Sequence, residues 1–119
     1  MRTLLSRPRL AHGLLLVALG MLPQSAPAAT TPTATKSVEI RIDNFTFEPA
    51  EITIAPGTKV TWVNADDIPH QVAEKDLAFR SKALDTDDSF SRTFDAAGVI
   101  DYFCTLHPHM TGKIIVKDP

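Results

Sequence analysis

The chain has 119 residues, a formal net charge of -2 and a hydrophobic content of 44%, as expected for one small globular domain. Its slight excess of acidic over basic residues argues against nucleic acid as a partner. Because the chain contains one cysteine, a disulfide scaffold within the chain is excluded.

The N-terminal 28 residues have the composition of a secretory signal peptide. Arginines at positions 2, 7 and 9 precede an apolar run over residues 14–22, and the small residues Ala26 and Ala28 follow it. The run has nine residues, whereas a helix that spans a bilayer needs about 20. We therefore expect residues 1–28 to be cleaved on export, with no membrane insertion afterwards. An uncleaved N-terminal anchor is the alternative.

Cleavage would leave 91 residues (119 minus 28) with a net charge of -5, from nine basic and fourteen acidic residues. Residues 29–37 are rich in Thr, Ala and Pro, and we expect them to form a flexible leader before a functional domain at residues 38–119. Cysteines of exported proteins usually pair as disulfides. The unpaired Cys104 therefore indicates either a buried apolar side chain or a reactive or ligating thiol.

From residue 38 onward, apolar and polar residues alternate with the period of two that is typical of strands. Val38, Ile40 and Ile42 show this pattern, and Pro56-Gly57 marks a turn. With no convincing helix, the sequence predicts an all-β fold, an antiparallel Greek-key β-sandwich of about seven or eight strands. The predicted strands are residues 38–42, 52–54, 59–64, 70–72, 89–95, 99–104 and 111–117.

Three segments fit this pattern less simply. Residues 44–49 are predicted to form a corner, and residues 74–88 a long surface connection with at most one helical turn or a short strand. Within it, the acidic run 85–88 is predicted to be solvated, with a docking face for a basic partner as the alternative. Arg92 shares a predicted face with Phe90 and Phe94, where we expect its stem to pack while its guanidinium reaches water.

The segment 104–110, CTLHPHM, contains Cys104, His107 and Met110 at Cys-x2-His-x2-Met spacing. In a strand, residues three apart point to opposite faces, and in a helix the first and last of the three lie about 240° apart. Pro108 disfavours both regular structures. A loop that wraps round a point would bring all three side chains together, which indicates a metal site. Thiolate, thioether and imidazole are ligands that copper favours.

Two histidines, one cysteine and a weak axial methionine form the arrangement of blue-copper sites. One further histidine is therefore required, and the mature chain offers His70 and His109. We favour His70, because a distant residue stiffened by the preceding Pro69 can pin the loop to the sandwich. The use of His109 would leave His107 facing outward.

The sequence resembles the cupredoxin family, and within it the amicyanin branch. The resemblance runs through residues 44–64, 68–72, 87–94 and 98–116, and it includes the compact ligand loop, which is longer in plastocyanin-like and azurin-like relatives. It implies one type 1 copper ion as the cofactor. The implied copper ligands are His70, Cys104, His107 and Met110. The chain departs from the amicyanin pattern at Gln71, where an asparagine is typical, and at His109, where an aromatic residue is typical.

The resemblance further implies a monomeric electron carrier of the bacterial periplasm that is not an enzyme. Its partners would be transient redox proteins, an upstream dehydrogenase and a downstream cytochrome or oxidase. We expect an apolar docking patch around the loop histidine, formed by Ile68, Pro69, Leu106 and Pro108. The alternative function is a periplasmic copper-binding protein that buffers or delivers copper. A zinc enzyme is disfavoured, because methionine is a poor zinc ligand.

Overall fold

The computed structural model describes residues 13, 20, 23–27 and 36–119. The predicted cleavage site at Ala28, and most of the predicted signal peptide and leader, lie outside these residues. Among the described residues, no helix is long and apolar enough to cross a membrane. The eight strands are β1 (Ser37–Asp43), β2 (Thr46–Glu48), β3 (Glu51–Ile54), β4 (Thr58–Asn64), β5 (Ala73–Glu74), β6 (Ser89–Phe94), β7 (Gly98–Phe103) and β8 (Thr111–Val116).

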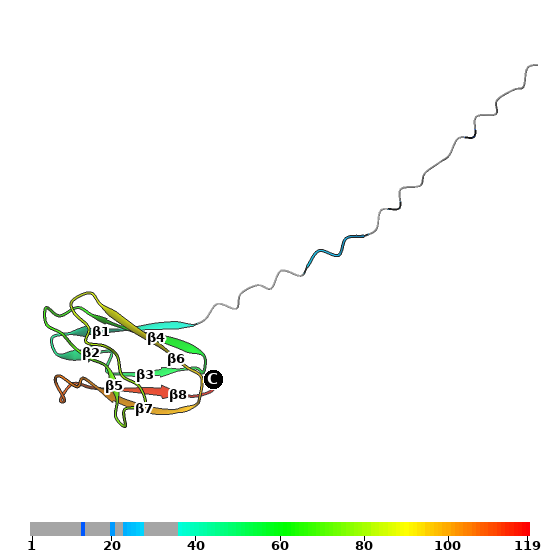
Figure 1. Cartoon of the computed structure of the whole chain (residues 1–119). Helices are drawn as coiled ribbons and strands as arrows, with labels where there is room; N and C mark the ends of the chain where they lie inside the picture. Colours follow the sequence, from blue (N-terminus) through cyan, green and yellow to red (C-terminus); the bar gives the residue numbers. More distant parts are fainter. Residues whose placement is uncertain (1–12, 14–19, 21–22, 28–35) are drawn as a thin grey trace, which may run out of the picture. The chain divides into compact units, whose positions relative to one another are not determined.

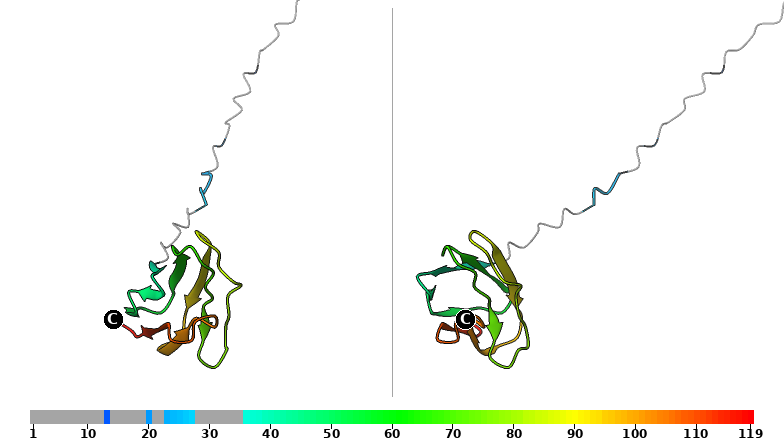
Figure 2. Two further views of the ribbon diagram at one scale, coloured as in Figure 1. Left: turned by 90° about the vertical axis from the view of Figure 1, so that its left-hand side faces the viewer. Right: turned by 60° about the vertical axis from the view of Figure 1, so that its left-hand side comes forward.

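The strands form two four-stranded sheets that face each other as a sandwich (Figures 1 and 2). One sheet has the order β2-β1-β4-β6 and the other β3-β8-β7-β5. The predicted all-β sandwich of about seven or eight strands is thereby confirmed, although the strands are not all antiparallel. Both sheets are mixed, because β1 pairs parallel with β4 and β3 pairs parallel with β8. The parallel pairing of β1 and β4 arises because the chain crosses to the second sheet at β3 before β4 returns to lie beside β1.

Alternation in the strands produces one shared core between the sheets. Ile40 and Ile42 of β1 are fully buried while Glu39 and Arg41 are exposed, as the period-two pattern predicts. Trp62 of β4 lies at the centre of an aromatic group with ring centroids 5.4 to 6.4 Å from its own. The aromatic residues around it are Phe79, Phe90, Phe94 and Tyr102. This packing makes a stiff platform, since protein interiors are close-packed.

The predicted corner at residues 44–49 is in part a strand. Asp43 pairs with Thr46, so that β1 and β2 form a hairpin whose two-residue loop is Asn44-Phe45. Both loop residues have positive φ, 49° and 58°. A loop of this length with two positive φ values is the tight turn that matches the twist of a hairpin. Three residues of strand are too few for alternation to reveal it in the sequence.

The connection over residues 74–88 contributes to the core, which the sequence did not predict. Phe79 and Leu84 are buried, and the segment folds back to pair with His70 through two backbone hydrogen bonds of 2.7 and 3.0 Å to Leu84. Its Phe79 ring also explains Arg92, whose guanidinium carbon lies 4.6 Å from the ring centroid. The guanidinium is thus held by a cation–π contact on the core-facing side of β6, which Arg92 shares with Phe90 and Phe94, although Arg92 itself is exposed.

Tyr102 of β7 is buried to 1% exposure, and its hydroxyl has no hydrogen-bond partner within the described residues. Burial raises the pKa of Tyr102 from 10.0 to about 12. The nearby Trp62 indole N–H acts in the opposite direction, but the effect of burial on the pKa is the larger one. Tyr102 is therefore strongly held in its neutral form.

We expect Tyr102 to contribute to alkaline unfolding. The pKa of Tyr102 is higher in the folded state, so the stability that this residue adds is complete below pH 10.0 and is lost as the pH rises through about 12. Tyr102→Phe should therefore stay folded to higher pH than the wild type in a circular dichroism titration. At neutral pH its free energy of unfolding should change by less than about 1 kcal/mol. Identical alkaline midpoints for the two proteins would contradict this expectation.

Candidate metal centre

The loop over residues 104–110 is neither helix nor strand, as its sequence predicted. Cys104 follows the end of β7, and its backbone N–H donates to the carbonyl of Met110 at 3.0 Å. The His107 N–H donates to the Cys104 carbonyl at 3.2 Å, and the Met110 N–H donates to the His107 carbonyl at 2.9 Å. Two consecutive turns therefore close the loop on itself before β8 begins.

His70 reaches the same place from the segment between β4 and β5. Asn64, at the end of β4, is fully buried, and its side-chain amide donates to the carbonyls of Ile68 and Leu84, each at 2.8 Å. Its side-chain oxygen accepts from the N–H of Asp66 at 2.9 Å. One satisfied polar side chain thus ties together the turn before His70 and the connection that covers it.

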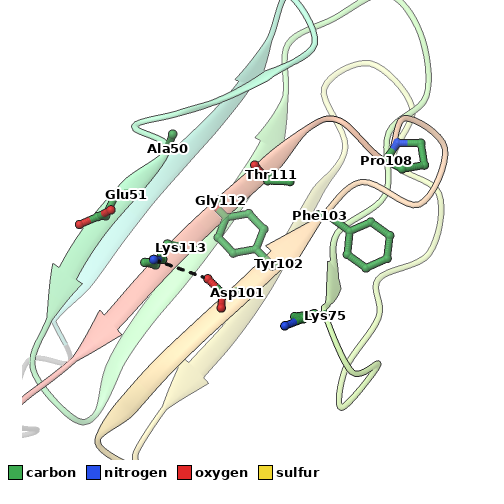
Figure 3. A pocket seen from close by; sticks show the side chains of 10 residues that line it. All are labelled: Ala50, Glu51, Lys75, Asp101, Tyr102, Phe103, Pro108, Thr111, Gly112 and Lys113. Atoms are coloured by element: carbon green, nitrogen blue, oxygen red, sulfur yellow. Dashed lines mark ion pairs between the residues drawn. The ribbon is translucent and has the colours of Figure 1, made fainter.

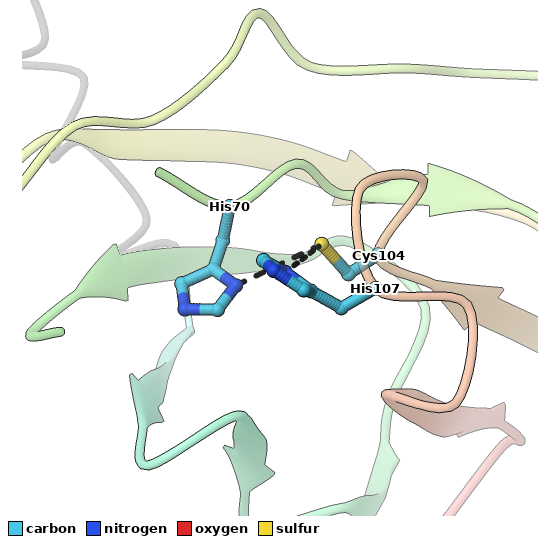
Figure 4. Close-up of side chains that lie close together, drawn as sticks. All are labelled: His70, Cys104 and His107. Atoms are coloured by element: carbon cyan, nitrogen blue, oxygen red, sulfur yellow. Dashed lines mark hydrogen bonds between the residues drawn. The ribbon is translucent and has the colours of Figure 1, made fainter. Parts of the chain in front are cut away.

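Cys104, His70 and His107 converge, and their potential ligand atoms lie within 4.8 Å of one another (Figure 4). The Cys104 Sγ lies 3.8 Å from the Nδ1 of His70 and 3.7 Å from the Nδ1 of His107. Bonds of about 2.3 Å to sulfur and about 2.0 Å to nitrogen, the lengths known for zinc, at a trigonal angle of about 120° would separate these atoms by about 3.7 Å. The observed spacing therefore fits three donors around one ion.

Met110 and His109 occupy different environments on this loop. Met110 is buried, and its backbone is hydrogen-bonded to the backbones of both Cys104 and His107. We therefore group it with the three converging residues. His109 is exposed and is not among the residues that converge within the described part of the chain. The structure thus brings together the four residues that the sequence singled out. We call His70, Cys104, His107 and Met110 the metal cluster.

Asp66 orients His70, a role that the sequence did not reveal. Its Oδ2 lies 2.6 Å from the Nε2 of His70, and its two oxygens accept the backbone N–H groups of Asn44 and Phe45 at 2.6 and 3.1 Å. Burial by itself would raise the pKa of Asp66, but the hydrogen bonds from Phe45 and Asn44, together with the hydrogen bond and charge of His70, lower it.

Because Asp66 is ionised, it can only accept, so the Nε2 of His70 carries the proton. Nδ1 is then the ring nitrogen that faces the Cys104 Sγ, and it is the nitrogen that would bind a metal. In the sequence, the available signal was the position of Asp66 four residues before His70. An aspartate at that position is equally typical of a turn.

Gln71, the first departure from the amicyanin pattern, links the ligand loop to the connection over residues 74–88. Its backbone N–H donates to the Cys104 Sγ at 3.3 Å. Its side-chain amide donates to the Ser81 carbonyl at 2.7 Å, and its side-chain oxygen accepts the hydroxyl of Thr105. The longer side chain therefore bridges the ligand loop and the connection that packs over His70. A hydrogen bond to the sulfur tunes the electron density of a thiolate ligand.

A pocket of about 560 Å³ lies apart from the metal cluster, on β3, β7 and β8 (Figure 3). It mixes charges of both signs, and Lys113 pairs with Asp101 at 3.9 Å across it. None of the metal-cluster residues lines it, so it adds no donor to the centre. The lining residues are Ala50, Glu51, Lys75, Asp101, Tyr102, Phe103, Pro108, Thr111, Gly112 and Lys113.

We expect Gln71→Leu to loosen the centre, since it keeps the backbone donor but removes both side-chain hydrogen bonds. The free energy of unfolding, measured in urea, should fall by about 1 to 2 kcal/mol, because the Ser81 carbonyl and the Thr105 hydroxyl lose their partner. The matched control is Thr105→Val, which removes one of the two bonds. In the double variant the effects should be non-additive by at least about 0.5 kcal/mol. Full additivity would show that the link does not couple the two segments.

Comparison with known proteins agrees with this geometry. Residues 13–116 match the sequence profile of the family described as a cupredoxin-like domain. The amicyanin of Paracoccus versutus is 38% identical over 96 residues, which cover 76% of this chain and 73% of that protein. The resemblance to cupredoxins and to their amicyanin branch is therefore confirmed.

Solved structures give the same result. The crystal structure of the Paracoccus versutus amicyanin superposes with a TM-score of 0.65 at 38% identity, over 72% of this chain and 86% of that one. A purple cupredoxin from Nitrosopumilus maritimus superposes with a TM-score of 0.63 at 32% identity, over 66% and 98%. The donor set fits the single copper ion that is the cofactor of such proteins. The chain therefore belongs to the cupredoxin-like family of blue copper electron-transfer proteins.

Proposed function

We propose that this protein is a periplasmic blue copper carrier that passes single electrons between transient redox partners. The observation that carries the proposal is the convergence of one sulfur and two imidazole nitrogens at trigonal spacing. In this proposal Cys104, His70 and His107 would hold the copper, and Met110 would add a weaker thioether ligand. Bound copper would supply the one-electron exchange between Cu(I) and Cu(II).

The surrounding residues would hold the donors in one geometry for both oxidation states. Asp66 fixes the ring of His70 from its far side, and the N–H of Gln71 donates to the Cys104 sulfur. Both His70 and Cys104 are fully buried in a packed sandwich. Donors that are already held in place need little rearrangement when charge changes, which favours fast electron transfer.

Electrons would enter and leave through His107, which is half-buried while His70 is fully buried. The predicted patch around it fits this role. Leu106 is 51% exposed, Pro69 and Pro108 are exposed, and Ile68 is half-buried. A small apolar surface around a redox centre suits brief, low-affinity docking of partners. We infer a carrier rather than an enzyme, since the cluster uses all its donors to hold the metal.

We also propose that residues 1–28 are a cleaved signal peptide and that the mature protein works in the periplasm. Support comes from the basic, apolar and small-residue segments in order. Cys104, the single cysteine, is buried, and the metal cluster gives it a role other than a disulfide.

We expect Cu(II) to give the purified protein an intense blue colour that depends on the thiolate. Cys104→Ala should abolish this visible absorption band, because the band arises from the bond between copper and sulfur. His109→Ala is the matched control from the same loop, and it should keep the band. A wild-type protein that binds Cu(II) without the band would overturn the proposed ligand set.

Electron transfer and copper delivery make different predictions. If the protein is a carrier, oxidised and reduced forms should exchange electrons quickly, as seen by NMR line broadening in mixtures, while the copper stays bound. The buried position of Cys104 and His70 supports this outcome. Loss of copper to an apo acceptor protein faster than electron exchange would instead favour the buffering or delivery function.

A further inference from the structure

Phe45, at the tip of the β1–β2 hairpin, packs against both imidazoles of the metal cluster. Its ring lies 5.0 Å from that of His107 at 86° and 5.7 Å from that of His70 at 89°, measured between centroids. These are edge-to-face contacts, a favourable geometry for aromatic rings. Phe45 is nevertheless 49% exposed, so it stands between the imidazoles and solvent at the end of the sandwich.

The backbone holds Phe45 in a position that a bulky residue rarely adopts. Its φ is +58°, in the left-handed region, where a side chain with a Cβ is disfavoured. The N–H groups of Asn44 and Phe45 both donate to the carboxylate of Asp66, which also binds the ring of His70. The same carboxylate therefore positions one ligand and the aromatic ring that covers it. An unfavourable backbone conformation that its surroundings maintain points to a role at a functional site.

His70 and His107 differ in the hydrogen-bond partners that hold the ring nitrogen facing away from Cys104. The Nε2 of His70 is bound by Asp66. Within residues 36–119, the recorded hydrogen bond of the His107 ring is the one through Nδ1 to the Cys104 sulfur. His107 lies on a short loop next to exposed Leu106 and Pro108. The His107 ring is therefore restrained by ring contacts: it packs on buried His70, with centroids 5.0 Å apart, and on Phe45, which is the contact on its solvent side.

We propose that Phe45 is a positioning residue of the metal centre. Its ring packs against His107, keeps that imidazole turned toward Cys104, and limits the access of competing ligands to the centre. The proposal rests on the proposed ligand roles of His70 and His107. Phe45 acts through the imidazoles and touches no copper itself. It would slow the release of Cu(I), because release would require the half-buried imidazole of His107 to swing away first.

The test compares Phe45 variants loaded with Cu(I) and mixed with excess bicinchoninate, a Cu(I) chelator. Phe45→Ala removes the ring, and Phe45→Gly removes it while it also relieves the positive φ. Phe45→Tyr keeps the ring and should retain the wild-type rate. The matched control is Leu77→Ala, since Leu77 is 56% exposed with a φ of +62° but makes none of the ring contacts recorded for Phe45.

We expect Phe45→Ala and Phe45→Gly to release Cu(I) about three- to tenfold faster than the wild type, the factor expected from the loss of the one edge-to-face contact with His107. Leu77→Ala should release it at the wild-type rate. Equal rates for Phe45→Gly and the wild type would overturn the proposal. Faster release from Leu77→Ala, or from Phe45→Tyr, would also overturn it, because the effect would then come from stability or from the turn.

A second readout uses the copper-free protein and does not depend on the proposed ligand roles. The ring signals of His107 in NMR spectra should be sharp in the wild type and in Phe45→Tyr, and broadened by exchange in Phe45→Gly. Unchanged His107 signals in Phe45→Gly would refute the proposal that Phe45 positions the His107 ring. If the wild type failed to bind copper through Cys104, the proposed function would fail while this comparison still decided the role of Phe45.

Discussion

The buried contact between Cys104 and His70 is the constraint on which the rest of the structure depends. The two residues are 34 positions apart, and their Sγ and Nδ1 atoms lie 3.8 Å from each other. Cys104 follows β7 of one sheet, whereas His70 follows β4 of the other. Both are fully buried, so the distance holds only while the sheets keep their relative position. The close-packed aromatic core around Trp62 supplies that rigidity.

A small polar network transmits this rigidity to the donors. Asn64, Asp66 and Gln71 lie close together along the chain, and each binds a group on at least one distant segment. Satisfied polar groups in a low-dielectric interior favour one arrangement, because any other leaves donors or acceptors unpaired. In a blue copper electron-transfer protein, one arrangement for two oxidation states is the functional requirement.

The topology gathers every functional segment at one end of the sandwich. The β1–β2 turn brings Phe45, the β4–β5 segment brings Asp66 and His70, and the β7–β8 loop brings Cys104 and His107. Exposure increases outward across the cluster, from buried His70 to half-buried His107 and exposed Leu106. The proposed donor His70 thus lies inside, and the proposed docking surface lies outside.

The sequence alone determined the fold class, the loop and its chemistry, because alternation and the Cys-x2-His-x2-Met spacing are local properties. It missed β2 and the burial of Phe79 and Leu84, since three residues or scattered apolar positions carry no period. Only the tertiary structure decided that His70, and not His109, meets Cys104, and that Asp66 and Phe45 belong to the centre. Apart from the contact between Asp66 and His70, those contacts join residues 21 to 62 positions apart (107 minus 45 for Phe45 and His107). No local pattern specifies which distant side chains a folded sandwich brings together.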